Sequence, residues 1–345
     1  MAINSDRKIK FAVVGCGHIG KRHAAVIQQQ SQAELVALID VKDQNDLDIA
    51  AYANIQFYNS IESFLALGTD VDVVNICTPN AFHSAQAIAC LQSGKHVVIE
   101  KPMALTAGDA QAVITQAAEV NKEVFVVMQN RYSPPSAWIN DVVKSGRLGK
   151  IFAVHLNCFW NRDERYYKAG SWHGTKDIDG GTLFTQFSHF IDVMYWLFGD
   201  IENINARLQN FNHSTLTQFE DSGTISFDFK NGGVGTMNFS TSVWEHNMES
   251  SIIIIAENGS VKIGGQYMDK VEYCSIKEYV MPLLQATNPG NNYGSYRGSA
   301  MNHQYIIDNV IEVLNGRATV TTTAQEGYHV VDMIERIYSA ANTIK

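Results

Sequence analysis

Apolar residues in the first third of the chain fall into short, nearly continuous runs that are separated by longer segments of mixed polarity. The runs are rich in valine and isoleucine and cover residues 11–14, 34–39, 71–76, 96–99 and 124–128. Strands of a parallel sheet that is covered on both faces have this composition. The segments between them predict helices at residues 22–30, 81–93 and 106–120. This alternation predicts right-handed βαβ crossovers in a doubly wound parallel sheet.

The pattern changes after residue 132, where Pro134 and Pro135 interrupt it. A helix is predicted at residues 136–145, a strand at 151–160, a polar loop at 161–181 and a helix at 183–198. Further strands are predicted at residues 223–229, 234–243, 251–256, 259–263 and 270–273, and helices at 302–314 and 324–343. Because these strands follow one another with short turns, they predict an antiparallel sheet.

The length of 345 residues is sufficient for two domains, each with its own core. We therefore predict an α/β domain over residues 1–130 and an α+β domain over residues 131–345. The first carries the parallel sheet, and the second carries the mainly antiparallel one.

Charge and cysteine content narrow the classes of function. The chain has 26 basic and 35 acidic residues, a net charge of −9. We expect no nucleic-acid partner, because phosphate binding relies on lysine and arginine. The five cysteines are scattered without a C-x-x-C pair, so neither a metal site nor a disulfide framework is predicted. Apolar runs are too short to cross a membrane, and we expect a cytoplasmic protein without a membrane partner.

A glycine-rich loop follows the first predicted strand. Gly15, Gly17 and Gly20, with His18 and Ile19 between the last two, fit the pattern G-x-G-x-x-G. The motif alone is weak, but its place between a strand and a helix is typical of a Rossmann dinucleotide-binding domain. One glycine permits the tight turn, the next lets the backbone approach a pyrophosphate, and the third allows close packing of helix and strand.

Asp40 ends the second predicted strand, twenty residues after Gly20. A carboxylate at this place accepts hydrogen bonds from the ribose hydroxyls of NAD and repels the extra phosphate of NADP. Lys42 would soften that repulsion. The sequence therefore favours NAD as the cofactor.

Two further polar segments follow strands three and four. Thr78, Pro79 and Asn80 come directly after the third strand, and His83 follows in the next helix. Because ligands of open α/β sheets lie at the carboxyl ends of the strands, we expect all four to face the cofactor. An alternative interpretation is that Asn80 caps the helix after a rigid proline turn.

Glu100, Lys101 and Pro102 close the fourth strand. A partly desolvated lysine beside a glutamate is a cation whose pKa can be tuned. Such a lysine can donate a hydrogen bond to a substrate hydroxyl and stabilise the alkoxide as hydride leaves. We predict that Glu100 and Lys101 lie at the cofactor, and that Pro102 fixes the backbone, with a cis bond as one way of doing so.

Together the glycine loop, Asp40, the turn at 78–80 and Glu100-Lys101-Pro102 resemble the family of glucose–fructose oxidoreductase, inositol dehydrogenase and MocA-like proteins. The resemblance covers nearly the whole chain. It implies an NAD-binding Rossmann domain followed by an open, mainly antiparallel sheet that often forms an oligomer interface. It also implies hydride transfer between a sugar-like alcohol carbon and nicotinamide, Lys101 as the catalytic lysine, and a homodimer or homotetramer.

The same resemblance gives a role to His189 in the second domain. On a helix, Gln186 and His189 share one face, and His189 matches the family's general base, with a side chain suited to proton transfer near neutrality. A buried histidine that is satisfied by its neighbours is the alternative. The chain departs from the family at Thr185, because many members carry an aspartate four residues before the histidine.

The aromatic and polar stretch from residue 159 to 181 is similar to the branch that acts on nucleotide sugars, in particular UDP-N-acetylglucosaminuronate 3-dehydrogenases of bacterial surface-polysaccharide pathways. This similarity implies cofactor contacts from Gln129 and Trp172. It implies substrate contacts from Arg131, Arg162, Tyr167, Gln186, His189, Arg297 and His303. The cations among them would hold an anionic substrate. Alternatively, Arg162, Arg165 and Lys168 form a solvated loop that is balanced by Asp163 and Glu164.

We therefore predict that NAD oxidises a sugar hydroxyl to a ketone, at C3 of a UDP-uronate. Two other functions remain open. One is oxidation of inositol, an aldose or another sugar by the same chemistry. The other is a non-catalytic, NAD-bound regulatory protein, because a fold alone does not define an activity.

Overall fold

The computed structural model describes residues 7–294 and 296–342, which fall into two compact units. The first unit contains the described residues up to Val127 together with His303–Val331. The second contains Met128–Asn302 and the described residues from Asp332 onward. The predicted division assigned everything after residue 130 to the second domain. The chain instead returns to the first unit, because α8 (His303–Leu314) packs against α1 (His18–Gln29).

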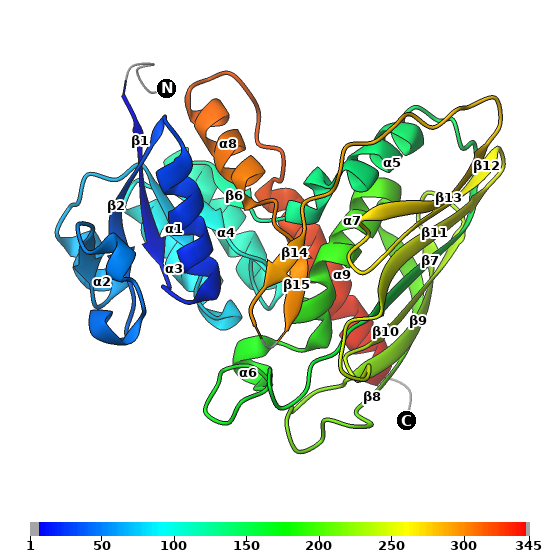
Figure 1. The fold of residues 1–345 in the computed structure, drawn as a ribbon, viewed down its shortest axis with the longest axis horizontal. Coiled ribbons are helices and arrows are strands. Elements are labelled where there is room, and N and C mark those ends of the chain that lie inside the picture. The colour runs from blue at the N-terminus through cyan, green and yellow to red at the C-terminus, as the bar shows by residue number, and fades with distance from the viewer. Residues whose placement is uncertain (1–6, 295, 343–345) are drawn as a thin grey trace. The chain divides into compact units, whose positions relative to one another are not determined.

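The first unit is built on a parallel sheet with the strand order β3-β2-β1-β4-β5-β6, which is the order of a Rossmann fold (Figure 1). Its strands are β1 (Ile9–Val14), β2 (Ala33–Ile39), β3 (Gln56–Tyr58), β4 (Val73–Ile76), β5 (His96–Ile99) and β6 (Val124–Val126). Because the strands are parallel, the residues that follow them meet at one edge of the sheet. The predicted fold class is confirmed.

Helices connect these strands, as the alternation predicted. They are α1, α2 (Ile61–Ala66), α3 (His83–Gln92) and α4 (Ala107–Val120), with short 3-10 turns at Gln44–Asp46, Ala50–Tyr52 and Asn80–Phe82. The sequence analysis missed β3 and α2, because a three-residue strand and a six-residue helix are too short to show a period.

The second unit contains a mixed sheet with the order β13-β12-β11-β7-β10-β9-β8. Its strands are β7 (Ile151–Phe159), β8 (Ile201–Gln209), β9 (Ser222–Phe229), β10 (Val234–Ser240), β11 (Glu249–Ala256), β12 (Gly259–Gly264) and β13 (Lys270–Ile276). Only the β7–β10 pair is parallel among the pairings of these described strands. The sheet is therefore mainly antiparallel, as predicted, although β8 was not anticipated.

Helices cover one face of this sheet. They include α5 (Pro134–Lys144) and α7 (Ser188–Phe198), which pack against each other, and α7 also contacts β7. The remaining elements are α6 (Lys176–Asp179), α9 (Ala324–Asn342), a 3-10 turn at Gln129–Tyr132 and the hairpin β14 (Gly290–Asn292) and β15 (Arg297–Ala300). The predicted end of the last helix, Thr343, lies outside the described residues.

The predicted helix over residues 183–198 consists of two parts. Leu183–Phe187 is a π-helical turn, and α7 begins at Ser188. Phe187 and Phe190 pack edge-on against Trp160, so this segment is attached to the core of the second unit. Single π-helical turns inside longer helices occur frequently at functional sites.

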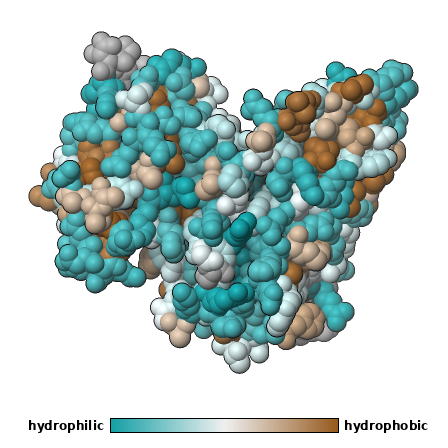
Figure 2. Space-filling view, in the orientation of Figure 1, coloured by the Kyte–Doolittle hydropathy of each residue, from teal (hydrophilic) through white to brown (hydrophobic). Residues whose placement is uncertain are grey.

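Apolar surface is uneven on the visible face of the molecule. Figure 2 shows it gathered over the end of the second unit that carries α5 and β12. Val280 and Leu283, in the segment that follows β13, are 91% and 100% exposed. None of the described helices combines the length and the apolar character that crossing a bilayer requires.

Candidate active site

The three glycines of the loop after β1 have different reasons to be glycine. Gly15 has a φ of +89°, and a Cβ there would lie 2.7 Å from the carbonyl oxygen of Cys77. At Gly20 a Cβ would lie 1.8 Å from the carbonyl oxygen of Gly15. At Gly17 a Cβ would meet nothing within 4 Å. The fold therefore requires glycine at positions 15 and 20, whereas at position 17 it leaves room for a ligand to approach the start of α1.

Asp40 lies beside this loop with its carboxylate fixed by the backbone. Its Oδ2 accepts a hydrogen bond of 2.7 Å from the amide of Cys16, and its Oδ1 accepts one of 2.9 Å from the amide of Lys42. α1 begins at His18, and the amide groups of a first helical turn are suited to binding an anion. A pyrophosphate fits the helix start, and a ribose fits Asp40, so the residues present are suited to NAD.

The turn after β4 is held by its neighbours. Thr78 donates a hydrogen bond of 2.6 Å to Gln86, and Pro79 precedes the 3-10 turn that begins at Asn80. α3 begins at His83, directly after this turn, so the cofactor contact and the capping role of Asn80 both stay predictions.

His83 has a different role from the one expected. Its side chain is buried, and its two ring nitrogens each lie 2.7 Å from a carbonyl oxygen, that of Pro102 and that of Thr78. Burial lowers the pKa of the ring, and a neutral imidazole donates from one nitrogen only, so one of these two contacts is a hydrogen bond. His83 thus lies between the two turns that follow β4 and β5, and its contact with the cofactor stays a prediction.

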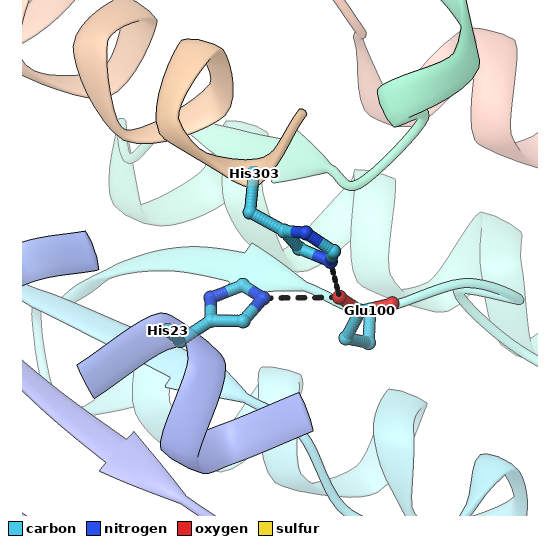
Figure 3. A group of neighbouring side chains, drawn as sticks. All are labelled: His23, Glu100 and His303. Atoms are coloured by element: carbon cyan, nitrogen blue, oxygen red, sulfur yellow. Dashed lines mark hydrogen bonds and ion pairs between the residues drawn. The ribbon is translucent and has the colours of Figure 1, made fainter. Parts of the chain in front are cut away.

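Glu100 and Lys101 lie at the end of β5, as predicted. Glu100 is buried, and its Oε2 accepts a hydrogen bond of 3.2 Å from the amide of Lys101. Lys101 is partly exposed, and the Lys101–Pro102 peptide bond is cis. Two histidines that the sequence analysis did not connect with this strand, His23 and His303, contact the other oxygen of Glu100 (Figure 3).

In the second unit, His189 and Gln186 are both buried at the junction of the π-helical turn and α7. The amide group of Gln186 is used by its neighbours: its oxygen accepts from Arg162 Nε at 2.7 Å, and its nitrogen donates to the hydroxyl of Tyr166 at 2.8 Å. Gln186 therefore fixes Arg162 and Tyr166, which is a different role from the predicted substrate contact.

Arg162 is enclosed rather than solvated. Its guanidinium carbon lies 4.8 Å from the ring centre of Trp160 and 5.1 Å from those of Tyr166 and Tyr296. It also donates to the carbonyl oxygen of Arg297 at 3.0 Å, and burial lowers its pKa. The alternative that Arg162 belongs to a solvated loop is therefore wrong, and its contact with substrate stays a prediction.

Arg131 is likewise committed to a partner inside the protein. It makes two hydrogen bonds to the buried carboxylate of Asp192, from Nε at 2.9 Å and from Nη2 at 2.6 Å. A paired guanidinium of this kind offers little charge to a substrate. The predicted contact of Arg131 with substrate is therefore not supported by its surroundings.

α6, which lies within the predicted polar loop, ends at another buried carboxylate, that of Asp179. Asp179 accepts hydrogen bonds from the amide of Gly174 at 2.8 Å and from the hydroxyl of Thr185. Thr185 thus carries a carboxylate partner although it replaces the aspartate of many family members. Trp172 packs at a tilt of 38° against His173, with ring centres 3.9 Å apart.

Tyr167 is buried, and it packs with Tyr166 and Phe219 in a small aromatic cluster. Gln129 is also buried and donates to the carbonyl oxygen of Ala300 at 3.2 Å. The surroundings of Tyr167 therefore do not indicate a substrate contact, and those of Gln129 do not indicate a cofactor contact. Both contacts stay predictions.

Arg297 is the predicted substrate residue that lies on the surface of a cavity. The cavity belongs to the second unit and has a volume of about 540 Å³. Polar and charged side chains dominate its wall, which includes Asn161, Arg165, Asn247, Gln266, Tyr296 and Arg297. Arg165 is exposed there and forms an ion pair of 2.6 Å with Asp163, as the solvated-loop interpretation proposed for this residue.

The structure thus brings together Arg162, Gln186 and the main chain of Arg297, whereas His303 belongs to the first unit, beside Glu100. Sequence reasoning missed His23, although its position three residues after Gly20 places both on one face of α1. It also missed Asp192, for which its place three residues after His189 was the available signal.

Two family models match the chain. Residues 9–128 match the oxidoreductase family with an NAD-binding Rossmann fold, and residues 137–262 match the GFO/IDH/MocA C-terminal domain. The chain therefore belongs to the Gfo/Idh/MocA family. It is an NAD-dependent dehydrogenase.

Several relatives of known structure or activity are similar over their whole length. The WlbA dehydrogenase of Chromobacterium violaceum, solved with NADH and UDP-GlcNAcA, has 31% sequence identity and a TM-score of 0.89, with 99% of this chain and 96% of that chain covered. The WlbA dehydrogenase of Bordetella pertussis, solved with the same two molecules, has 31% identity and a TM-score of 0.86, with 98% and 97% covered. The D-glucoside 3-dehydrogenase of Escherichia coli has 24% identity over 97% of this chain and 96% of its own length.

Proposed function

We propose that this protein oxidises a hydroxyl of a nucleotide sugar, C3 of a UDP-N-acetylglucosaminuronate, to a ketone with NAD as hydride acceptor. The observation that carries the proposal is the likeness to two WlbA dehydrogenases at 31% identity over 98% or more of this chain, because both were solved with NADH and UDP-GlcNAcA. The presence of Lys101 and His189 supports turnover rather than a regulatory role.

The residues of the first unit would bind and orient the cofactor. The amides at the start of α1 would hold the pyrophosphate, and Asp40 would accept hydrogen bonds from the adenosine ribose. When bound, NAD supplies a carbon that accepts hydride from the sugar. The protein's contribution is then to place the sugar carbon and to control the hydroxyl proton.

Lys101 and His189 would control that proton. The Lys101 ammonium donates a hydrogen bond to the reacting oxygen and stabilises the negative charge that grows on it as hydride leaves. His189 would accept the hydroxyl proton. The oxygen thereby becomes a carbonyl oxygen without carrying a full charge through the reaction.

The substrate's anionic groups need cations that are not already paired. Arg131 is paired with Asp192, and Arg162 is enclosed by aromatic rings, so neither meets this need. Arg297 is exposed on the wall of the polar cavity of about 540 Å³. We therefore assign the recognition of the anion to Arg297, in place of the larger set of cations expected from the sequence.

The same resemblance supports a homo-oligomer formed through the sheet of the second unit. The outward-facing Val234 and Ile255 on this sheet are 53% and 39% exposed. Burying such residues against a second copy would remove apolar surface from water. Sedimentation of the purified protein would give a dimer or tetramer, and a monomer at all concentrations would contradict the assignment.

The experiment that tests the substrate combines absorbance at 340 nm with thermal unfolding. Protein and NAD+ are tested with UDP-N-acetylglucosaminuronate, UDP-N-acetylglucosamine, myo-inositol and glucose, with and without a keto acid that recycles tightly held NADH. A ligand that binds only the folded protein raises its melting temperature. A response to the UDP-uronate supports the proposal. A response to myo-inositol or glucose alone assigns another sugar, and stabilisation by NAD+ alone contradicts all of these substrates.

The catalytic assignment predicts that Lys101→Met lowers kcat about 10³-fold, because general acid–base and electrostatic contributions of one side chain have this size. The stabilisation by NAD+ should remain, because the pyrophosphate and ribose contacts lie elsewhere. The exposed Lys8 provides a matched control, since Lys8→Met makes the same change far from any proposed contact. Retention of most activity by Lys101→Met would exclude the role of Lys101.

A further inference from the structure

A buried cluster lies directly behind Lys101 in the first unit. It consists of His23 from α1, Glu100 at the end of β5 and His303 at the start of α8, which are 0%, 6% and 1% exposed. His23 Nε2 lies 3.0 Å and His303 Nε2 lies 3.4 Å from the same oxygen, Oε1 of Glu100. Figure 3 shows the two rings directed at this carboxylate from different helices. Residues that are 77 and 203 positions from Glu100 in the sequence thus meet at its carboxylate.

The contacts of His23 show which of its ring nitrogens faces Glu100. Its Nδ1 lies 2.8 Å from the amide nitrogen of Asn75, a group that only donates. With the Asn75 amide in this orientation, His23 Nδ1 accepts its hydrogen bond, and Nε2 is the ring nitrogen that faces Glu100. Histidine and glutamate are also zinc ligands, but here Nε2 lies at hydrogen-bonding distance from Glu100 Oε1. Hydrogen bonding therefore accounts for the His23–Glu100 contact.

The cluster keeps Glu100 charged inside the protein. Burial raises the pKa of a carboxyl, yet the contacts with the two imidazoles outweigh it, and the pKa of Glu100 lies well below its ordinary value. A buried anion is stable only when it is hydrogen-bonded or paired. The imidazoles face one oxygen, and the other oxygen is left to accept from the amide of Lys101 at 3.2 Å.

We propose that His23 and His303 are positioning residues for Lys101, which hold the Glu100 carboxylate so that it fixes the main chain at Lys101. His83 acts from the other side, because one of its ring nitrogens lies 2.7 Å from the carbonyl oxygen of Pro102. The segment that carries the lysine is thereby held on both sides. This inference rests on the catalytic role proposed for Lys101, and it gives His303 a different role from the substrate contact that the sequence implied.

The substitution of His303 separates this role from simple packing. His303→Leu removes both nitrogens with little change in volume, whereas His303→Gln places an amide N–H near the position of Nε2. We expect His303→Leu to lower kcat about 10²-fold, the effect of a misplaced catalytic group. The KM and the stabilisation by NAD+ should stay within about twofold, and His303→Gln should recover most of the loss. The rates are measured with the most active sugar of the panel above.

A second measurement does not depend on turnover. Hydrogen–deuterium exchange of the peptide that contains Lys101 reports whether its amide is protected by Glu100. His303→Leu and Glu100→Gln should both speed this exchange at least about fivefold relative to unfolding of the whole unit, and His303→Gln should not. Unchanged exchange in both variants would overturn the proposal, and Glu100→Gln keeps the test available if His303→Leu does not fold.

The outcomes distinguish this proposal from the proposed function. If Lys101→Met keeps its activity, the role of Lys101 fails. If Lys101→Met is inactive but His303→Leu has a normal kcat per folded molecule, only the positioning role fails. In the Lys101→Met background, His303→Leu should change the residual rate no further. One equivalent of a transition metal in the purified protein, lost with His303→Leu, would show a metal centre instead and would also overturn the proposal.

Discussion

Glu100 in the first unit and Glu220 in the second are carboxyl groups whose pKa values move in opposite directions. Burial raises the pKa in both. At Glu100, His23 and His303 reverse that effect, so its pKa falls well below the ordinary value. Glu220 has the hydroxyl of Tyr338 at 2.7 Å and the amide of Thr182 at 3.2 Å instead, and its pKa rises to about 7. Burial alone therefore does not decide whether a carboxylate is charged; the groups that face it do.

In the second unit, too, the neighbouring groups decide the state of the buried cations. Arg131 is neutralised by Asp192, which lies 61 residues further along the chain, and Arg162 is held by rings and oxygen atoms from several segments. In the first unit, by contrast, the groups expected to hold the cofactor belong to short motifs at strand ends. Neighbours in the sequence thus indicate which groups of the first unit can bind a ligand. In the second unit, residues far apart in the sequence decide whether a charged side chain is already paired.

The largest expected effect tests the local character of the first unit. Gly20→Ala would place a Cβ 1.8 Å from the carbonyl oxygen of Gly15, so we expect a loss of on the order of 4 kcal/mol of unfolding free energy or an unfolded protein. Gly17→Ala is the matched variant, because its Cβ meets nothing within 4 Å. It should unfold normally without ligand but lose most of the stabilisation by NAD+. Thermal unfolding with and without NAD+ measures both, and equal behaviour of the two variants would refute the distinction.

The next effect concerns the long-range pairing of the second unit. Arg131→Met removes the two hydrogen bonds that the buried carboxylate of Asp192 accepts from Arg131, which should cost about 3–5 kcal/mol of unfolding free energy. Adding Asp192→Leu removes the buried carboxylate as well, so the double variant should recover part of that loss. Urea denaturation gives these values. A loss below about 1 kcal/mol for the single variant would mean that the pair is not buried as described.

The pH dependence of stability sharpens the comparison of the two carboxyl groups. The ordinary pKa of a glutamate is 4.5, whereas that of Glu220 is about 7 in the folded protein because burial disfavours its charge. Between these values the folded state binds more protons than the unfolded state, so the unfolding free energy falls as pH rises. The contribution is complete below pH 4.5 and is lost as pH rises through about 7.

We expect this contribution to be on the order of 2 kcal/mol, less than the full shift implies because Glu220 is partly exposed. Glu220→Gln should remove this pH dependence. The unfolding free energy of the variant should therefore fall less between pH 5 and pH 8 than that of the unchanged protein. Urea denaturation of both proteins at the two pH values makes the comparison. A parallel pH dependence in the two proteins would contradict the raised pKa of Glu220.

The smallest effect is expected at the exposed ion pair of Arg165 and Asp163 on the cavity of the second unit. Arg165→Gln should not change the melting temperature measurably, because exposed ion pairs contribute little to stability. Arg297→Gln should also unfold normally, yet it should raise the KM for an anionic sugar while Arg165→Gln does not. Equal KM values for the two variants would remove Arg297 from substrate recognition.

The sequence by itself was sufficient for the two kinds of sheet, for most strands of both units and for the motif residues at the carboxyl ends of β1, β2, β4 and β5. These features depend on short-range periodicity and on glycine positions, and both can be recognised within a few consecutive residues. The short elements β3 and α2 were missed because a few residues cannot show a period, and β8 was missed although it has nine residues.

Only the tertiary structure decided the partners of the buried charges. Contacts between residues tens to hundreds of positions apart place α8 in the first unit and His303 beside Glu100. Contacts of the same kind give Arg131 and Arg162 their partners inside the protein. The free energy of a charged side chain is set by desolvation and by the few groups within hydrogen-bonding reach. Those groups are brought together by folding, and the spacing of residues along the chain does not predict which of them will meet.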